Sequence, residues 1–183
     1  MPRDLMVSAR EEARLDRAAL ERLYVKLEKP MFNVVYRWLW NAADAREVVQ
    51  DAFLRVWKAR ERVELETVTP LLYKTALNLA ANRRRAAKVR RFFGLEELEA
   101  APSNERRTDE QLEHEQKKKR VREAIDSLPE RLREVIVMTE IAEMPYEEIG
   151  EVLGIPAGTV GSRRHAALKA LAEKLGPIDG VET

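Results

Sequence analysis

The chain has 183 residues, of which 45% are hydrophobic and 36% charged, yet its formal net charge at pH 7 is only +1. The absence of cysteine excludes disulfide bonds and thiolate metal sites, and no apolar stretch has the length of a signal peptide or membrane-spanning helix. Scarce glycine and aromatic residues favour helices over strands. We therefore expect a cytoplasmic, all-α protein with no membrane insertion, metal or cofactor.

Charge is distributed unevenly along the chain. Residues 69–91 include seven cationic side chains and no acid, whereas residues 92–116 carry eight acids against Arg106 and Arg107. The acidic stretch also contains Pro102 and lacks a sustained helical period, which is typical of a linker. The sequence thus predicts two small helical domains, residues 1–91 and 112–183, joined by a flexible acidic linker over residues 92–111.

The N-terminal part should begin with one or two helices over residues 18–40, followed by a helix that Asp44 could cap. In this second segment apolar residues recur at helical spacing, which predicts one buried face. The members of that face are Val48, Val49, Ala52, Phe53, Val56 and Trp57. The opposite, polar face is solvent-exposed by default, and residues 59–69 should form a loop.

A further helix should start at Thr69-Pro70, because proline is tolerated in the first helical turn. Lys74, Asn78, Asn82 and Arg85 then fall on one polar stripe. Cations can pair with phosphates and amides can hydrogen-bond base edges. The stripe could be an ordinary exposed face, but seven cations without an intervening acid favour nucleic-acid binding.

The C-terminal part should contain helices over residues 116–125 and 129–141, followed by a helix-turn-helix. Gly150 is small where two helices must cross, Gly154 suits a left-handed turn, and Val160 would anchor the second helix, over residues 157–175. This spacing is typical of DNA-binding modules, although a simple helical hairpin would share it. The outward side chains of the second helix would be Thr159, Ser162, Arg163, His165 and Lys169.

Four stretches in this order resemble the extracytoplasmic-function (ECF) group of the sigma-70 family. They are residues 44–58 (DAREVVQDAFLRVWK), 72–80 (LYKTALNLA), 128–135 (LPERLREV) and 146–154 (YEEIGEVLG) with 158–163 (GTVGSR). The resemblance covers most of the chain. It implies a transcription initiation factor, not an enzyme, with a sigma region 2 domain and a sigma region 4 domain.

The resemblance also implies roles for individual residues. Glu47, Gln50, Asp51 and Arg55 would dock on the clamp helices of the largest subunit of core RNA polymerase. Residues 59–69 would capture a base flipped from the minus-10 element, and Lys74, Asn78, Asn82, Arg83 and Arg85 would hold the melted strand and adjacent duplex. Thr159, Ser162, Arg163, Arg164, His165 and Lys169 would read the minus-35 element. The implied protein is a monomer with promoter DNA, polymerase and an anti-sigma factor as partners.

Some positions depart from the family pattern, and other functions are compatible with parts of the sequence. Gly161 stands where the family usually has lysine, and Arg164 where it usually has an apolar residue, so Arg164 must snorkel or contact DNA. A helix-turn-helix regulator could bind duplex DNA without polymerase, normally as a dimer. A helical adaptor that binds only protein would leave both basic stretches unexplained.

Overall fold

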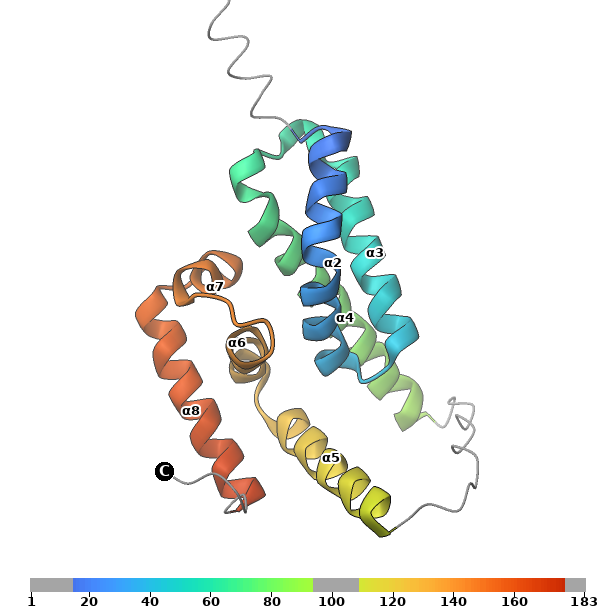
Figure 1. Cartoon of the computed structure of the whole chain (residues 1–183), viewed down its shortest axis with the longest axis vertical. Helices are drawn as coiled ribbons and strands as arrows, with labels where there is room; N and C mark the ends of the chain where they lie inside the picture. Colours follow the sequence, from blue (N-terminus) through green and yellow to red (C-terminus); the bar gives the residue numbers. More distant parts are fainter. Residues whose placement is uncertain (1–14, 94–108, 177–183) are drawn as a thin grey trace, which may run out of the picture.

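The computed structural model describes residues 15–93 and 109–176, and their regular structure is entirely helical (Figure 1). This confirms the all-α prediction. The order is α2 (Arg17–Leu39), α3 (Ala42–Lys58), the short 3-10 turns η1 (Arg60–Arg62) and η2 (Leu65–Thr67), α4 (Val68–Phe92), α5 (Asp109–Ser127), α6 (Glu130–Glu140), α7 (Tyr146–Leu153) and α8 (Ala157–Leu175). Most of the predicted linker, residues 94–108, lies outside the described residues.

Helices α2, α3 and α4 pack against one another as an N-terminal bundle. The predicted segment 18–40 forms a single helix, α2 (Arg17–Leu39), despite Pro30, and Asp16 caps it by accepting a hydrogen bond from the Ala19 amide. The prediction that Asp44 caps the next helix is wrong. Asn41 is the cap, and its side chain accepts from the Asp44 amide at 3.0 Å, because α3 already begins at Ala42.

The bundle buries the apolar side that the helical spacing predicted, except that Trp57 at its end is only half-buried. Val48, Ala52 and Val56 of α3 are at most 2% exposed, and α2 contributes Met31 and Trp38 to the same core. At 25 cal/mol per Å², complete burial of one such side chain contributes about 1.5–3 kcal/mol. This packing fixes which sides of α3 and α4 face outward.

In the C-terminal half, α6, α7 and α8 pack around Val135, Ile149 and Val160, each fully buried. Helix α5 precedes them and is longer than the predicted 116–125, since it begins at Asp109. Acidic residues near a helix N-terminus interact favourably with the helix dipole, which explains why part of the acidic stretch is helical.

The two halves touch each other. Helix α7 contacts α4 and α6 contacts α2, whereas α8 lies on the side of the C-terminal half away from the bundle (Figure 1). Tyr73 of α4 is 3% exposed, and its burial raises its pKa to about 12, with a further contribution from the charge of Glu148 on α7. The burial of Tyr73 therefore contributes to the contact between α4 and α7.

Candidate nucleic-acid and protein interfaces

The predicted basic stripe is an exposed side of α4. Lys74, Asn78, Asn82 and Arg85 are all exposed, while Leu72, Ala76 and Ala80 on the other side are buried in the bundle. The helix contains no acidic residue over residues 68–92. Its outer surface can therefore attract phosphates without competition from its own carboxylates.

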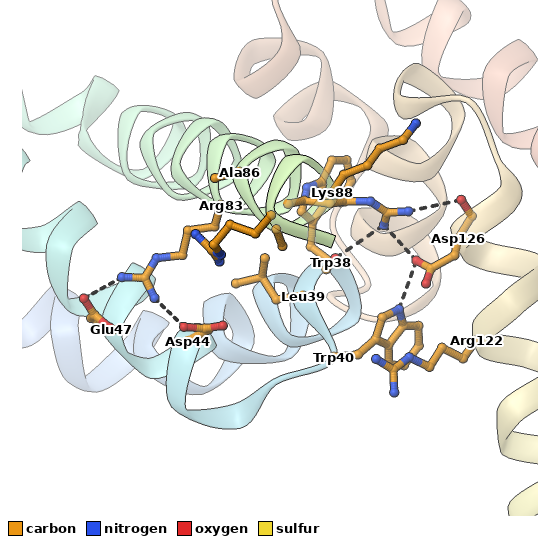
Figure 2. A pocket seen from close by; sticks show the side chains of 13 residues that line it. Trp38, Leu39, Trp40, Asp44, Glu47, Arg83, Ala86, Lys88, Arg122 and Asp126 are labelled. Atoms are coloured by element: carbon orange, nitrogen blue, oxygen red, sulfur yellow. Dashed lines mark hydrogen bonds and ion pairs between the residues drawn. The ribbon is translucent and has the colours of Figure 1, made fainter. Parts of the chain in front are cut away.

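Arg83 lies differently from the stripe, although it was predicted with it. Its guanidinium forms ion pairs with Asp44, at 2.7 Å, and with Glu47, both on α3 (Figure 2). The hydrogen bond from Arg83 lowers the pKa of Glu47, and the same bond is the main cause of the raised pKa of Arg83. A contact between Arg83 and DNA stays a prediction, and it would require breaking these pairs.

The polar residues predicted to bind another protein lie on the outer side of α3. Glu47, Gln50 and Arg55 are exposed, and Asp51 is half-buried. Leu54 lies among them and is 47% exposed, so this surface combines charges with an apolar contact. Leu54 was not among the residues predicted from the sequence. An apolar residue outside the buried stripe of α3 is nevertheless a visible signal of an exposed apolar contact.

The segment between α3 and α4 was predicted to be a loop but contains the turns η1 and η2. Arg60 stacks 4.4 Å from the ring centre of Trp57 and donates a hydrogen bond to its carbonyl oxygen. Val63 is buried and anchors the segment, while Leu65 is 39% exposed. The two turns place exposed side chains, Leu65 among them, beside the start of α4.

The helix-turn-helix prediction is confirmed in its geometry by α7 and α8. A Cβ atom at Gly150 would lie 2.7 Å from the carbonyl oxygen of Ile155, so only glycine permits the close approach of the turn. Gly154 has φ +66°, the left-handed conformation that ends α7. These two glycines fix the angle at which α8 leaves the turn.

The side chains of α8 that were predicted to read DNA differ in their exposure to solvent and in their neighbours. Ser162, His165 and Lys169 are exposed, and Ser162 donates a hydrogen bond to the Thr159 carbonyl oxygen at 3.0 Å. Arg163 is half-buried near Glu134 of α6. Burial raises the pKa of Glu134, Glu130 raises it further, and Arg163 opposes the shift.

Arg164 takes part in an ion pair that the sequence did not predict, and its contact with DNA stays a prediction. Its Nε atom donates to Oε1 of Glu140 at 2.6 Å, which ties α8 to the end of α6. Tyr146 also contributes to the raised pKa of Arg164, after the larger effect of Glu140. The ring of Tyr146 lies 3.3 Å from where a Cβ atom at Gly161 would be. The two departures from the family pattern on α8 therefore meet in one cluster.

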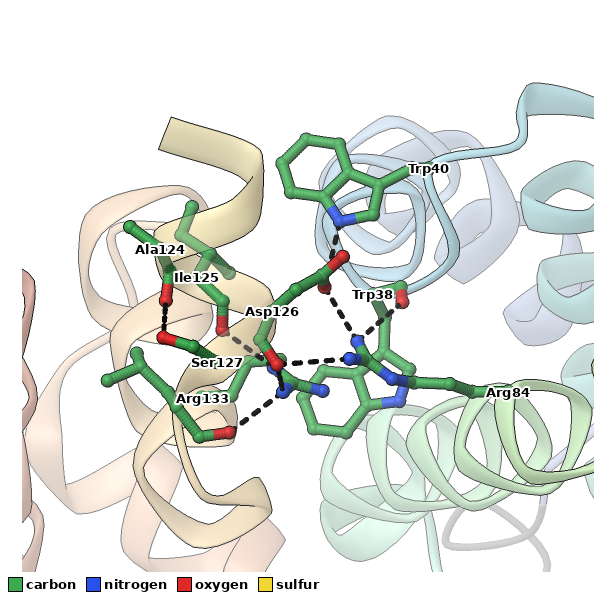
Figure 3. Close-up of polar contacts among 9 residues, drawn as sticks. Trp38, Trp40, Arg84, Ala124, Ile125, Asp126, Ser127 and Arg133 are labelled. Atoms are coloured by element: carbon green, nitrogen blue, oxygen red, sulfur yellow. Dashed lines mark hydrogen bonds and ion pairs between the residues drawn. The ribbon is translucent and has the colours of Figure 1, made fainter. Parts of the chain in front are cut away.

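A polar junction that the sequence did not predict joins the two halves. Asp126, in the last turn of α5, accepts hydrogen bonds from Arg84 Nη1 at 2.7 Å and from Trp40 Nε1 at 3.1 Å (Figure 3). Trp40 has a left-handed backbone, φ 56°, at the end of α2. Such a conformation is costly for a bulky residue, about 1–3 kcal/mol, so its surroundings must hold it in place.

Arg133 completes this junction from α6. It is 5% exposed, donates to the carbonyl oxygens of Ile125, Asp126 and Leu128, and stacks 5.3 Å from the ring centre of Trp38. Burial lowers the pKa of Arg133, with Arg84 as the next cause. A cavity of about 680 Å³ opens beside the junction, lined mostly by α4 with further residues from α2, α3 and α5 (Figure 2). Sequence spacing could not reveal contacts between residues 86 positions apart.

Other site types find no support in the described part of the chain. Residues 15–93 and 109–176 contain no cluster of three or more histidine, cysteine, aspartate or glutamate residues able to hold a metal ion. None of the helices described is long and apolar enough to cross a membrane.

Comparisons with known proteins agree with this geometry. Residues 23–90 match the family model for Sigma-70 region 2, and residues 118–171 match Sigma-70, region 4. The chain is 31% identical to the ECF RNA polymerase sigma factor SigE of Mycolicibacterium smegmatis over 79% of its own length, and spans 57% of that protein. It is 28% identical to SigW of Bacillus subtilis, covering 79% of the chain and 82% of SigW. For the sigma-E factor of Escherichia coli K12 the identity is 28%, covering 89% of the chain and 90% of that factor.

Solved structures share the fold. CnrH in complex with the cytosolic domain of CnrY has a TM-score of 0.64 at 23% identity, covering 86% of this chain and 88% of that chain. RpoE in complex with the anti-sigma factor NepR from Bartonella quintana has a TM-score of 0.59 at 20% identity. The match covers 85% of this chain and 95% of that chain. With both sigma regions in order on a matching fold, the chain belongs to the ECF group of the sigma-70 family, the promoter-directing sigma factors of RNA polymerase.

Proposed function

We propose that this sigma factor binds core RNA polymerase through α3, engages and melts the minus-10 element with α4 and the preceding turns, and reads the minus-35 element with α8. The observation that carries this proposal is a pair of exposed polar surfaces on different halves of the chain: the acid-free stripe of α4 and the outer side of a helix-turn-helix. In vitro transcription with core polymerase is the direct test. Start-site selectivity that does not change on adding the protein would refute the proposal.

The polymerase-binding surface would be the outer side of α3, with the clamp helices of the largest subunit as its partner. Exposed Gln50 and Leu54 with half-buried Asp51 offer amide, apolar and acidic groups on one surface. We expect the double variant Gln50→Ala and Asp51→Ala to lose core enzyme in a pull-down. The matched control changes Glu28 and Lys29 to alanine on the exposed side of α2, and it should retain core enzyme.

The minus-10 surface would combine the α4 stripe with the turns η1 and η2. Phosphates would pair with the cations of α4, and an unstacked base would dock near the exposed residues of the two turns. The binding free energy would offset the few kcal/mol needed to unstack one base step of the DNA. Replacing Lys74 and Asn78 by alanine should reduce strand opening, measured with a fluorescent base analogue in the minus-10 element. The control Lys26→Ala on α2 should leave opening unchanged.

The minus-35 surface would be the N-terminal half of α8, inserted in the major groove. Arg163→Ala should weaken minus-35 binding by about 1–3 kcal/mol, the contribution of one good base contact. Footprinting of wild-type and variant holoenzymes would measure this. Equal protection of the minus-35 region by both would contradict the role of Arg163.

We also propose the remaining features of an ECF factor for this chain: a region 2 domain over residues 1–91, a linker over residues 92–111, a region 4 domain over residues 112–183, and a monomer acting in the cytoplasm. An anti-sigma factor is a further proposed partner. It rests on the similar fold of RpoE, whose structure contains the anti-sigma factor NepR. No covalent chemistry is required at any step. Because two domains held on one polymerase have a high effective concentration on promoter DNA, weak individual contacts suffice.

A further inference from the structure

The cluster around Arg164 joins three helices of the C-terminal half. Arg164 of α8 pairs with Glu140 at the end of α6, and the side chain of Tyr146, at the start of α7, lies close enough to raise the pKa of Arg164 further. Arg164 and Glu140 are 36% and 38% exposed at their side chains, so neither is fully solvated. The Nε–H group, one of the five N–H donors of the guanidinium, is therefore already used in a bond to Glu140.

Gly161 lies one helical turn before Arg164, and its lack of a side chain makes room for the Tyr146 ring. A Cβ atom there would meet ring atom Cε2 at 3.3 Å and Cδ2 at 3.8 Å. A contact at 3.3 Å is tighter than ordinary van der Waals packing, so any side chain at position 161 would require the ring to shift by a few tenths of an ångström. Because Tyr146 also lies near Arg164, such a shift would disturb the surroundings of the Arg164–Glu140 pair.

We infer that Arg164 is a positioning residue, which together with Glu140, Tyr146 and Gly161 sets the orientation of α8, and that it does not itself contact DNA. This inference rests on the proposed minus-35 reading by α8. It narrows the reading surface to Ser162, Arg163, His165 and Lys169, with Thr159 half-buried at its edge. It also implies that an acidic residue, Glu140, strengthens the binding of DNA, although DNA is itself a polyanion.

Simple electrostatics predicts the opposite effect for Glu140. Removing an acid near DNA normally strengthens binding, because fewer like charges approach the phosphates. If Glu140 instead orients α8 through Arg164, its removal weakens binding relative to an acid that lacks this role. Glu143 is a matched control, since it is exposed and lies in the connection between α6 and α7.

The experiment measures binding of holoenzymes to promoter duplexes that the wild-type holoenzyme selects from a library randomised upstream of the transcription start. The variants are Arg164→Gln, Glu140→Gln, the charge exchange E140R with R164E, and the controls Glu143→Gln and Lys169→Gln. Because exposed ion pairs stabilise a protein only weakly, we expect Arg164→Gln to weaken binding by up to about fivefold. Glu140→Gln should bind more weakly than Glu143→Gln, and the exchange should recover most of the loss.

Salt dependence separates a positioning residue from a phosphate contact. Each phosphate contact contributes about −0.9 to the slope of log K against log salt concentration. We expect Arg164→Gln to keep the wild-type slope and Lys169→Gln to lose about one contact. Since the slope does not depend on the fraction of active protein, it remains informative if Arg164→Gln lowers stability.

The outcomes discriminate between this inference and the proposed function. A slope reduced by Arg164→Gln, stronger binding by Glu140→Gln than by Glu143→Gln, or a further loss in the charge exchange would each overturn the positioning role alone. A wild-type holoenzyme that shows no dependence on the minus-35 sequence would overturn the proposed function of α8, and the positioning role with it.

Discussion

The contact between the two halves should be measurable as a coupling between Arg84 and Asp126. Asp126→Ala removes the acceptor of a guanidinium hydrogen bond of 2.7 Å and of an indole hydrogen bond of 3.1 Å. Both bonds have the Asp126 carboxylate as acceptor, and a hydrogen bond to a charged group contributes about 1.5–3 kcal/mol when it is not screened by water. Because both side chains of the ion pair are 33% exposed, water screens this site, and we assign each bond about 1 kcal/mol, the upper end for exposed pairs.

The local effect of the same change has the opposite sign. An acid in the last turn of a helix opposes the helix dipole, so Asp126→Ala should stabilise α5 by about 0.3–1 kcal/mol. The net destabilisation is therefore about 1 kcal/mol. A double-mutant cycle with Arg84→Ala cancels the local term and isolates the coupling, for which we expect about 1 kcal/mol.

Urea unfolding of the full chain, followed by circular dichroism, gives the four free energies of unfolding for this cycle. The control is Glu123→Ala, since Glu123 lies on the same helix and pairs only with Lys119 of α5, at 4.0 Å, in the described structure. Its coupling with Arg84→Ala should be zero. A coupling below about 0.3 kcal/mol between Arg84 and Asp126, the usual limit of additivity, would mean that the two halves do not hold this contact in solution.

Three further changes test the local geometry. Glu134→Gln should raise the urea midpoint at pH 7, because burial raises the pKa of Glu134 and so penalises its ionised form; the gain should vanish below about pH 4, where glutamate is protonated in both states. Gly150→Ala should cost about 1–3 kcal/mol, because its Cβ would lie 2.7 Å from a carbonyl oxygen. Gly158→Ala, in open space on α8, should instead stabilise by about 0.5–1 kcal/mol, and equal thermal shifts for the two would contradict the steric argument. Asn41→Ala should lower the free energy of unfolding by about 1 kcal/mol through loss of the α3 cap, and an unchanged melting temperature would exclude that contribution.

Local patterns in the sequence determined the helices and much of the candidate interface. The spacing of Val48, Ala52 and Val56 predicted the buried side of α3, and the spacing of Gly150, Gly154 and Val160 predicted the helix-turn-helix. Both succeed because a helix repeats every 3.6 residues, so a few neighbouring positions define its sides. The exposed stripe of α4 followed from the same rule. Helix ends were less certain, as the cap at Asn41 and the early start of α5 demonstrate.

Only the tertiary structure decided which charged residues are free. From the sequence alone, Arg83, Arg84, Arg85 and Arg164 are equivalent cations, yet Arg84 pairs with Asp126, Arg83 with Asp44 and Glu47, and Arg164 with Glu140. Arg85 stays exposed on the α4 stripe. An ion pair depends on the distance between groups that are 24 to 42 positions apart, and that distance is set by how the helices pack, which no local pattern encodes.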